Sequence, residues 1–121
     1  MLSPPGNLFD SDSRSAGQTL GKEDFAVLVD SPHVKVERIV SNGDASPPGF
    51  WYDQPWAEWV AVLAGSAGLA FENEPEVMVL RVGDHILIPP RKRHRVEWTD
   101  KRCATIWLAV HYPGPSQSLP I

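Results

Sequence analysis

A glutamate and a histidine that both lie within apolar strand patterns are the residues of this sequence best suited to chemistry. Glu58 begins the run EWVAVL, in which every second residue shares one face of a strand. His94 begins the run HRVEW, whose alternation places it beside Val96 and Trp98 on the inward face. A buried carboxylate is costly unless it is paired or bound to a cation. We therefore predict that Glu58 and His94 meet inside a β-structure, either as ligands of a metal or small molecule or as a hydrogen-bonded pair.

The elements that would position these two residues are short strands joined by tight turns. Before His94 the chain has a turn at Gly83-Asp84, a β-forming run at 85–88 and a strand break at Pro89-Pro90. A short basic loop, 91–93, leads into the alternating strand that begins at His94. The stretch therefore predicts a strand, a polar loop and a second strand with the histidine at its start.

The rest of the chain repeats this pattern of short β-forming runs between turn residues. It contains 12 prolines and 9 glycines, and no stretch has the period of a convincing amphipathic helix. These features predict an all-β fold, an antiparallel double-sheet β-barrel or jelly roll. The expected strands are 25–29, 34–40, 58–63, 68–72, 77–82, 85–88, 94–99 and 103–112.

The length of 121 residues corresponds to one domain with a substantial core. We expect the barrel to span residues 21–113. The polar segment 1–20 is expected to be a loosely structured leader, and 114–121 a flexible tail.

Charge and cysteine content narrow the class of partner and the compartment. The net charge of −4 disfavours a nucleic acid or an anionic membrane as partner. No apolar run approaches the roughly 18 residues of a membrane span, and the N-terminus does not resemble a secretory signal. The single cysteine, Cys103, excludes an intrachain disulfide and suits a reducing compartment. We therefore expect a cytoplasmic protein.

The stretch Gly83–Trp98 also carries the spacing of a known family motif. The second conserved motif of the cupins runs G-x5-P-x-G-x2-H-x3-N, and Gly83, Pro89 and His94 fall at its spacings. Arg91 stands where the family has its second glycine, and Trp98 stands where it often has asparagine. The chain resembles a small single-domain cupin over roughly residues 34–112.

The first cupin motif, G-x5-H-x-H-x3,4-E-x6-G, is matched only in its second half. Glu58 and Gly65 have the required separation. Counting back from Glu58, the two histidine positions fall on Tyr52 and Gln54, or on their neighbours Trp51 and Asp53. Neither pair contains a histidine.

The resemblance implies a β-barrel with a metal or ligand pocket at its mouth. Typical cupins bind one divalent metal ion through three histidines and one glutamate. Of these ligands Glu58 and His94 are present, while Gln54 could offer an amide oxygen and Tyr52 a phenolate. Such a set is compatible with Zn, Ni, Mn or Fe, although tyrosine must lose a proton with a pKa near 10 to bind well.

Several further residues are expected to line the pocket. His111 shares a strand face with Trp107 and could be a spare ligand, an acid or base, or a solvent-facing strand end. Tryptophans of the aromatic segment, such as Trp51, could wall a pocket for a sugar ring or an aromatic ligand, or form a dimer face. Trp98 is also expected to line the pocket, beside His94. Arg91 could hold a carboxylate or phosphate, or simply belong to a solvated loop.

Two functions stay open at this point. The first is a metal-dependent enzyme acting on a small molecule, such as a dioxygenase, isomerase or decarboxylase. The second is a non-catalytic cupin that binds a small ligand without a metal. Both functions stay open because the fold does not decide between an enzyme and a binding protein. In either case the resemblance implies a homodimer formed through sheet packing.

Overall fold

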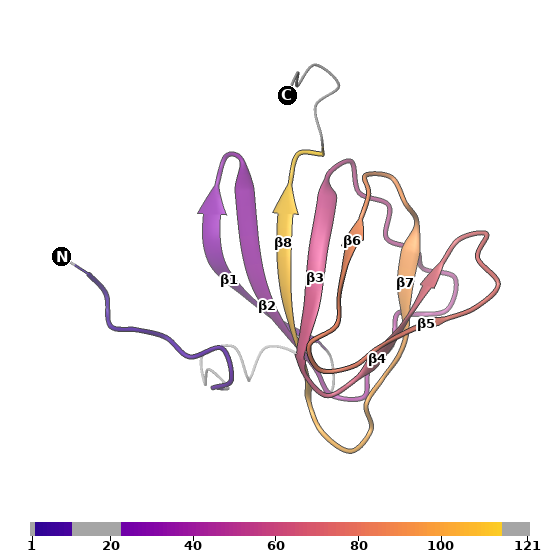
Figure 1. Cartoon of the computed structure of the whole chain (residues 1–121), viewed down its shortest axis with the longest axis horizontal. Coiled ribbons are helices and arrows are strands. Elements are labelled where there is room, and N and C mark those ends of the chain that lie inside the picture. The colour runs from indigo at the N-terminus through magenta and orange to yellow at the C-terminus, as the bar shows by residue number, and fades with distance from the viewer. Residues whose placement is uncertain (1, 11–22, 115–121) are drawn as a thin grey trace.

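Eight strands in two antiparallel sheets form the protein, as the computed structural model shows for residues 2–10 and 23–114 (Figure 1). The all-β prediction is confirmed, and each predicted strand is present. The predicted leader and tail lie largely outside the described residues. The strands are β1 (Asp24–Ser31), β2 (Val34–Ser41), β3 (Ala57–Ala64), β4 (Ala67–Phe71), β5 (Met78–Leu80), β6 (His85–Ile88), β7 (His94–Thr99) and β8 (Thr105–Tyr112).

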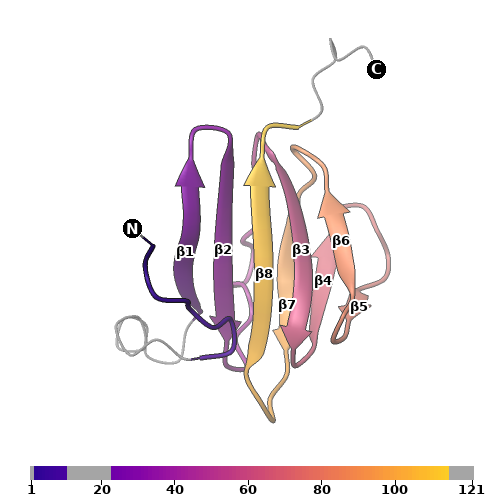
Figure 2. The same cartoon turned by 60° about the vertical axis from the view of Figure 1, so that its left-hand side comes forward.

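The larger sheet has the order β1-β2-β8-β3-β6, and the smaller sheet has the order β5-β4-β7. The last strand, β8, lies between β2 and β3, so segments far apart in the sequence are neighbours (Figure 2). The two predicted site residues lie on different sheets, Glu58 on β3 of the larger sheet and His94 on β7 of the smaller one. Within the described residues, no helix is long and apolar enough to cross a membrane.

The space between the sheets is filled by the inward side chains of alternating strands. On β3 and β8 the inward face is the one that carries Val60, Val62, Trp107 and Ala109, which are all buried. Each large apolar side chain stabilises the fold by about 1.5–3 kcal/mol when it is fully buried. The buried core cluster comprises Val60, Val62, Ala67, Leu69, Phe71, Leu80, Ile88, Val96, Trp107 and Ala109.

A bulge in β7 changes the predicted face of Trp98. The pairing of β4 with β7 passes from Leu69 opposite Val96 to Gly68 opposite Trp98, so Glu97 is an extra residue. The inward alternation therefore ends at Val96 and resumes at Thr99, which is fully buried. The prediction that Trp98 points inward beside His94 is wrong, because its indole lies on the outer face against Gly68.

The turn between β3 and β4 depends on a glycine. Gly65 has a φ of 77°, in the left-handed region that residues with a Cβ rarely adopt. It also packs against the start of β8, since a Cβ added at Gly65 would lie 2.5 Å from Oγ1 of Thr105. Gly83 has a similar φ of 91°, but nothing lies within 4 Å of the corresponding Cβ position.

Substitutions at these two glycines separate the cost of the left-handed backbone from the cost of crowding against Thr105. We expect Gly83→Ala to lower the free energy of unfolding by about 1–2 kcal/mol, the cost of the left-handed backbone. Gly65→Ala should lower it by about 3 kcal/mol, because overpacking against Thr105 adds to that strain. Urea denaturation of both variants measures the difference. Equal losses would contradict a role for crowding at Gly65.

Candidate functional site

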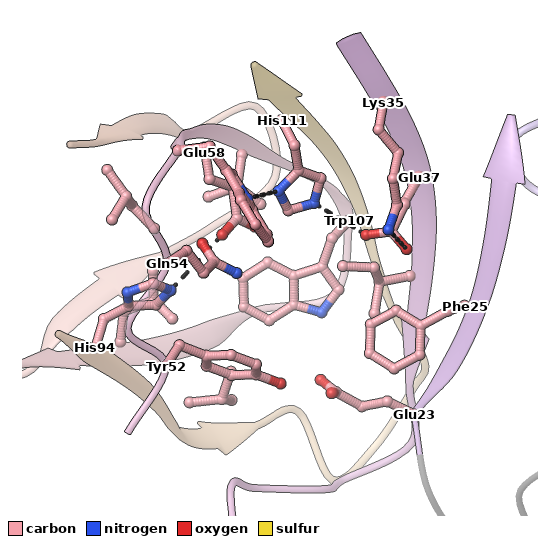
Figure 3. Close-up of a pocket in the computed structure, with 16 residues that line it drawn as sticks. Glu23, Phe25, Lys35, Glu37, Tyr52, Gln54, Glu58, His94, Trp107 and His111 are labelled. Atoms are coloured by element: carbon pink, nitrogen blue, oxygen red, sulfur yellow. Dashed lines mark hydrogen bonds and ion pairs between the residues drawn. The ribbon is translucent and has the colours of Figure 1, made fainter. Parts of the chain in front are cut away.

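A cavity of about 150 Å³ lies between the sheets, with the apolar core as its floor. A single buried water needs only about 15 Å³ on this measure, so a small molecule has room. Six of the residues predicted for the site line it, and Figure 3 shows them around one space. They are Tyr52, Gln54, Glu58, His94, Trp107 and His111.

Three residues predicted for the ligand pocket do not line this cavity, and each has a physical reason. Trp98 is turned outward by the bulge in β7. Trp51 lies under the guanidinium of Arg93, 5.8 Å from the ring centre. Arg91 is exposed and pairs with Asp53 at 3.4 Å, so the structure does not bring this predicted anion clamp into the cavity.

Glu58 and His94 lie side by side in the lining of the cavity and face each other, as predicted. His94 is 4% exposed and Glu58 is 8% exposed. The His94 Nε2 atom lies 3.6 Å from Oε1 of Glu58, which is longer than a good hydrogen bond (Figure 3). On the other side of the ring, Nδ1 lies 2.9 Å from the backbone oxygen of Lys92.

This geometry fixes the tautomer of a neutral His94. A backbone carbonyl can only accept a hydrogen bond, so Nδ1 of His94 carries the proton. The lone pair of Nε2 then points toward the carboxylate of Glu58. An imidazole held by its second nitrogen in this way has the arrangement found in metal-binding histidines.

Backbone hydrogen bonds hold the segment before β3 against β7 and the loop that precedes it. The backbone N–H of Tyr52 donates to the backbone oxygen of His94 at 2.7 Å, and the backbone oxygen of Tyr52 accepts from the N–H of His94 at 3.1 Å. Their rings stack with centroids 5.3 Å apart. The N–H of Arg91 donates to the backbone oxygen of Gln54 at 2.6 Å. Tyr52 and Gln54, which occupy the histidine positions of the first motif, are thus fixed at the cavity.

The backbone of Arg91 explains why the second motif can be kept without its glycine. Arg91 has a φ of 65°, the left-handed conformation that a glycine adopts without strain. A residue with a Cβ pays about 1–2 kcal/mol for this conformation. The turn geometry is therefore preserved in this chain, and only the residue type differs.

The cavity concentrates negative charge. Three carboxylates, Glu23, Glu37 and Glu58, line it together with one lysine, Lys35. Burial raises the pKa of Tyr52 to about 12, and the nearby charges of the same three glutamates add to the shift. Burial also raises the pKa of Glu23, although a hydrogen bond from Ser41 opposes the change. A bound cation would relieve this repulsion, whereas a phenolate at Tyr52 would increase it.

The donors present fit a divalent metal ion in part. Glu58 and His94 offer a carboxylate oxygen and an imidazole lone pair, and the side chain of Gln54 points into the cavity beside them (Figure 3). In the part of the chain that the structure describes, no three His, Cys, Asp or Glu side chains group around a metal position. A third protein ligand at this position would therefore be the amide of Gln54.

No protein-family model and no curated protein matches the sequence. Among solved structures, the chain is 46% identical to a proposed mannose-6-phosphate isomerase from Ralstonia eutropha JMP134. The match covers 93% of this chain and 100% of that chain, with a TM-score of 0.82. A cupin superfamily protein from Desulfitobacterium hafniense DCB-2 is 16% identical, with coverages of 76% and 78% and a TM-score of 0.63. An RmlC-like cupin from Shewanella frigidimarina NCIMB 400 is also 16% identical, with coverages of 82% and 83% and a TM-score of 0.63.

The chain belongs to the cupin superfamily. The family resemblance inferred from two motifs is thereby confirmed. The cupins at 16% identity show the fold alone.

The cupin cavity contains residues that the sequence analysis did not select. Glu23, Phe25, Lys35 and Glu37 line it, beside Trp56 of the aromatic segment that was expected to wall a pocket. The alternation of Lys35, Glu37 and Ile39 was visible in the sequence, but the opposite face holds Val34, Val36 and Arg38, so neither face was clearly apolar. The structure resolves this ambiguity because Arg38 is buried outside the cavity and donates to backbone oxygens of the described N-terminal segment.

Titration of Tyr52 tests the negative charge of the cupin cavity. With a pKa of about 12, the folded protein keeps a proton that the unfolded chain loses near pH 10. Stability from this group is therefore complete below pH 10 and is lost as the pH rises toward 12. The difference in tyrosinate absorbance between wild type and Tyr52→Phe should rise near pH 12. The same difference, measured with Glu58→Gln in both proteins, should rise at a lower pH. A midpoint near pH 10 would contradict the charge cluster.

Proposed function

We propose that this cupin binds one divalent metal ion through Glu58, His94 and Gln54 and holds a small hydroxylated molecule beside it. One observation carries the proposal, namely that the Nε2 lone pair of His94 faces the Glu58 carboxylate at 3.6 Å. The side chain of His94 is 6% exposed and that of Glu58 is 11% exposed. Among the described residues, neither Nε2 of His94 nor the Glu58 carboxylate has a hydrogen-bond partner. Two electron-rich groups held in this way are stabilised by a positive charge between them.

The donor types favour Zn, Ni, Mn or Fe, which accept imidazole together with oxygen ligands. Gln54 is a neutral and weaker donor than a third histidine, so binding should be weaker than in a three-histidine site. When bound, the metal would supply Lewis-acid chemistry by polarising an oxygen atom of the ligand. The chain itself orients His94 through Lys92 and excludes bulk water with the apolar floor of the cavity.

The cavity walls suit a small ligand with both apolar and polar surface. Aromatic side chains of Tyr52, Trp56 and Trp107 alternate with the polar groups, as is common in small-molecule sites. A relative that is 46% identical is a proposed mannose-6-phosphate isomerase. We therefore propose an isomerisation of a hydroxylated carbonyl compound as the reaction of this cupin. Lys35 is the one lysine or arginine of the described lining and could hold a phosphate group near the mouth.

A coupled assay for the conversion of mannose 6-phosphate to fructose 6-phosphate tests this reaction. Metal-loaded wild type should catalyse it, and Glu58→Gln and His94→Gln should each lower kcat/KM by at least about a hundredfold, as expected when a catalytic metal is lost. His85→Gln is the matched control, because His85 lies against Trp59 on the outer face of the barrel. No turnover by metal-loaded wild type would exclude this substrate while leaving the metal site untouched.

The contact between His94 and Glu58 is also compatible with a second function. If His94 carries a second proton, its Nε2 and Glu58 form a buried ion pair at 3.6 Å. The protein would then be a non-catalytic cupin that binds a small ligand without a metal. The two functions differ in whether the positive charge is a metal ion or a proton.

Elemental analysis of protein purified without chelator and without an affinity metal separates the two. We expect close to one metal ion per chain in wild type and in His85→Gln. Glu58→Gln and His94→Gln should each retain less than about a tenth of that amount, because each removes a strong ligand. Traces of metal in wild type that neither variant lowers would favour the metal-free function.

A further inference from the structure

A second polar cluster lines the same cavity and takes no part in the proposed metal site. His111 on β8 lies with Nε2 at 2.9 Å from Oε1 of Glu37 on β2 (Figure 3). Its other ring nitrogen, Nδ1, lies 2.9 Å from the indole nitrogen of Trp56. Lys35 flanks the carboxylate, with Nζ 3.6 Å from Oε2 of Glu37.

The hydrogen bonds of His111 define where its proton lies. An indole N–H can only donate, so Nδ1 of His111 must accept the bond from Trp56. The ring proton is then on Nε2 and is donated to Glu37. The hydrogen bond with His111 lowers the pKa of Glu37 despite its partial burial. His111 is therefore a neutral imidazole with an oriented carboxylate behind it, in the tautomer opposite to that of His94.

The strands hold the backbones of His111 and Glu37 rigidly, while Trp56 is less constrained. In the larger sheet His111 is paired with Lys35 of β2 on one side and with Glu58 of β3 on the other. Glu37 is also within β2 and is buried. Trp56 precedes β3 in a loop and is 40% exposed. Of the two hydrogen-bond partners of His111, the indole is thus the one that can move without breaking a strand.

Trp56 and His111 also separate the cavity from the solvent. Both residues line the internal cavity and an adjoining surface hollow formed with Pro32, Pro55 and Tyr112. The hydrogen bond between Trp56 and His111 spans this boundary. Movement of the indole would expose the Nδ1 lone pair and widen the path from the hollow to the cavity.

We propose that His111 is the proton acceptor of this cavity, that Glu37 positions its ring, and that Trp56 covers Nδ1 until a ligand replaces the indole. The inference rests on the proposed function for the presence of a small hydroxylated carbonyl compound in the cavity. The ligand must itself offer a proton at the position of the indole N–H. A hydroxyl group or a C–H next to a carbonyl has the required chemistry.

The proton transfer is balanced within the cavity. Nδ1 of His111 takes a proton from the carbon next to the carbonyl, and the C–H electron pair forms a C=C bond as the carbonyl oxygen becomes an enolate. Glu37 stabilises the imidazolium through its bond to Nε2–H. Return of the proton from Nδ1 to the former carbonyl carbon, with a proton passing between the two ligand oxygens, gives the isomer. No oxidant or reductant is required.

The test is the rate at which diethyl pyrocarbonate modifies each of the four histidines, measured by peptide mass spectrometry. The reagent attacks an unprotonated ring nitrogen, so His111 reacts only when its bond to Trp56 opens. Trp56→Phe keeps an aromatic wall but removes the N–H, and should speed modification of His111 about tenfold, the worth of one strong hydrogen bond. Trp59→Phe, on the outer face beside His85, is the matched control and should leave His111 unchanged.

Adding Glu37→Gln to Trp56→Phe should remove most of that increase, because the ring loses the carboxylate that fixes its tautomer. A His111 rate that Trp56→Phe leaves unchanged, or that Glu37→Gln does not lower, would overturn the proposal. So would faster modification of all four histidines, which would report opening of the barrel. The measurements use chelator-treated protein, so an absent metal site would not alter them. Loss of the metal proposal and loss of this one are therefore distinguishable.

Discussion

A carboxylate and the lone pair of a neutral imidazole repel each other when they face each other inside a protein, and a positive charge between them relieves this repulsion. Glu58 and His94 are in this position, with Oε1 and Nε2 3.6 Å apart and both side chains enclosed by the two sheets. Moving a charged group away from water costs several kcal/mol when it is not compensated, on the order of the whole stability of a small domain. Much of the surrounding structure serves to hold this pair, and the negative cavity around it adds to the demand for a cation.

The architecture supplies this arrangement by bringing four distant segments together. The strand order β2-β8-β3 places Glu37, His111 and Glu58 on neighbouring strands of one sheet. The facing sheet contributes His94, and the segment before β3 is tied to it through the backbone of Tyr52. Because strands and backbone hydrogen bonds fix all these groups, the cavity is largely preformed. Trp56 is the exception, since it lies in a loop and is partly exposed.

The sequence predicted the fold and six of the residues that line the cavity, and the limits have physical causes. Period-two patterns in mostly apolar runs predicted that Glu58 and His94 meet inside the protein, and both line the cavity. Trp98 was misplaced because a bulge adds one residue to β7, and nothing in its alternating sequence signals the extra residue. Glu37 was missed because the faces of β2 both carry charge, one toward the cavity and one toward the N-terminal segment. The hydrogen-bond partners of His111 come from two other segments, the loop before β3 and strand β2, so no local pattern could predict their contacts.

The proposed metal ion would lie between His94 and Glu58. The most direct test is a crystal structure of the protein grown with Zn²⁺ or Mn²⁺, with anomalous diffraction recorded at the absorption edge of the metal. We expect one strong peak at about 2.0–2.2 Å from both Nε2 of His94 and a carboxylate oxygen of Glu58, the usual length of such bonds. An empty position, with His94 and Glu58 drawn together into a direct hydrogen bond, would contradict it.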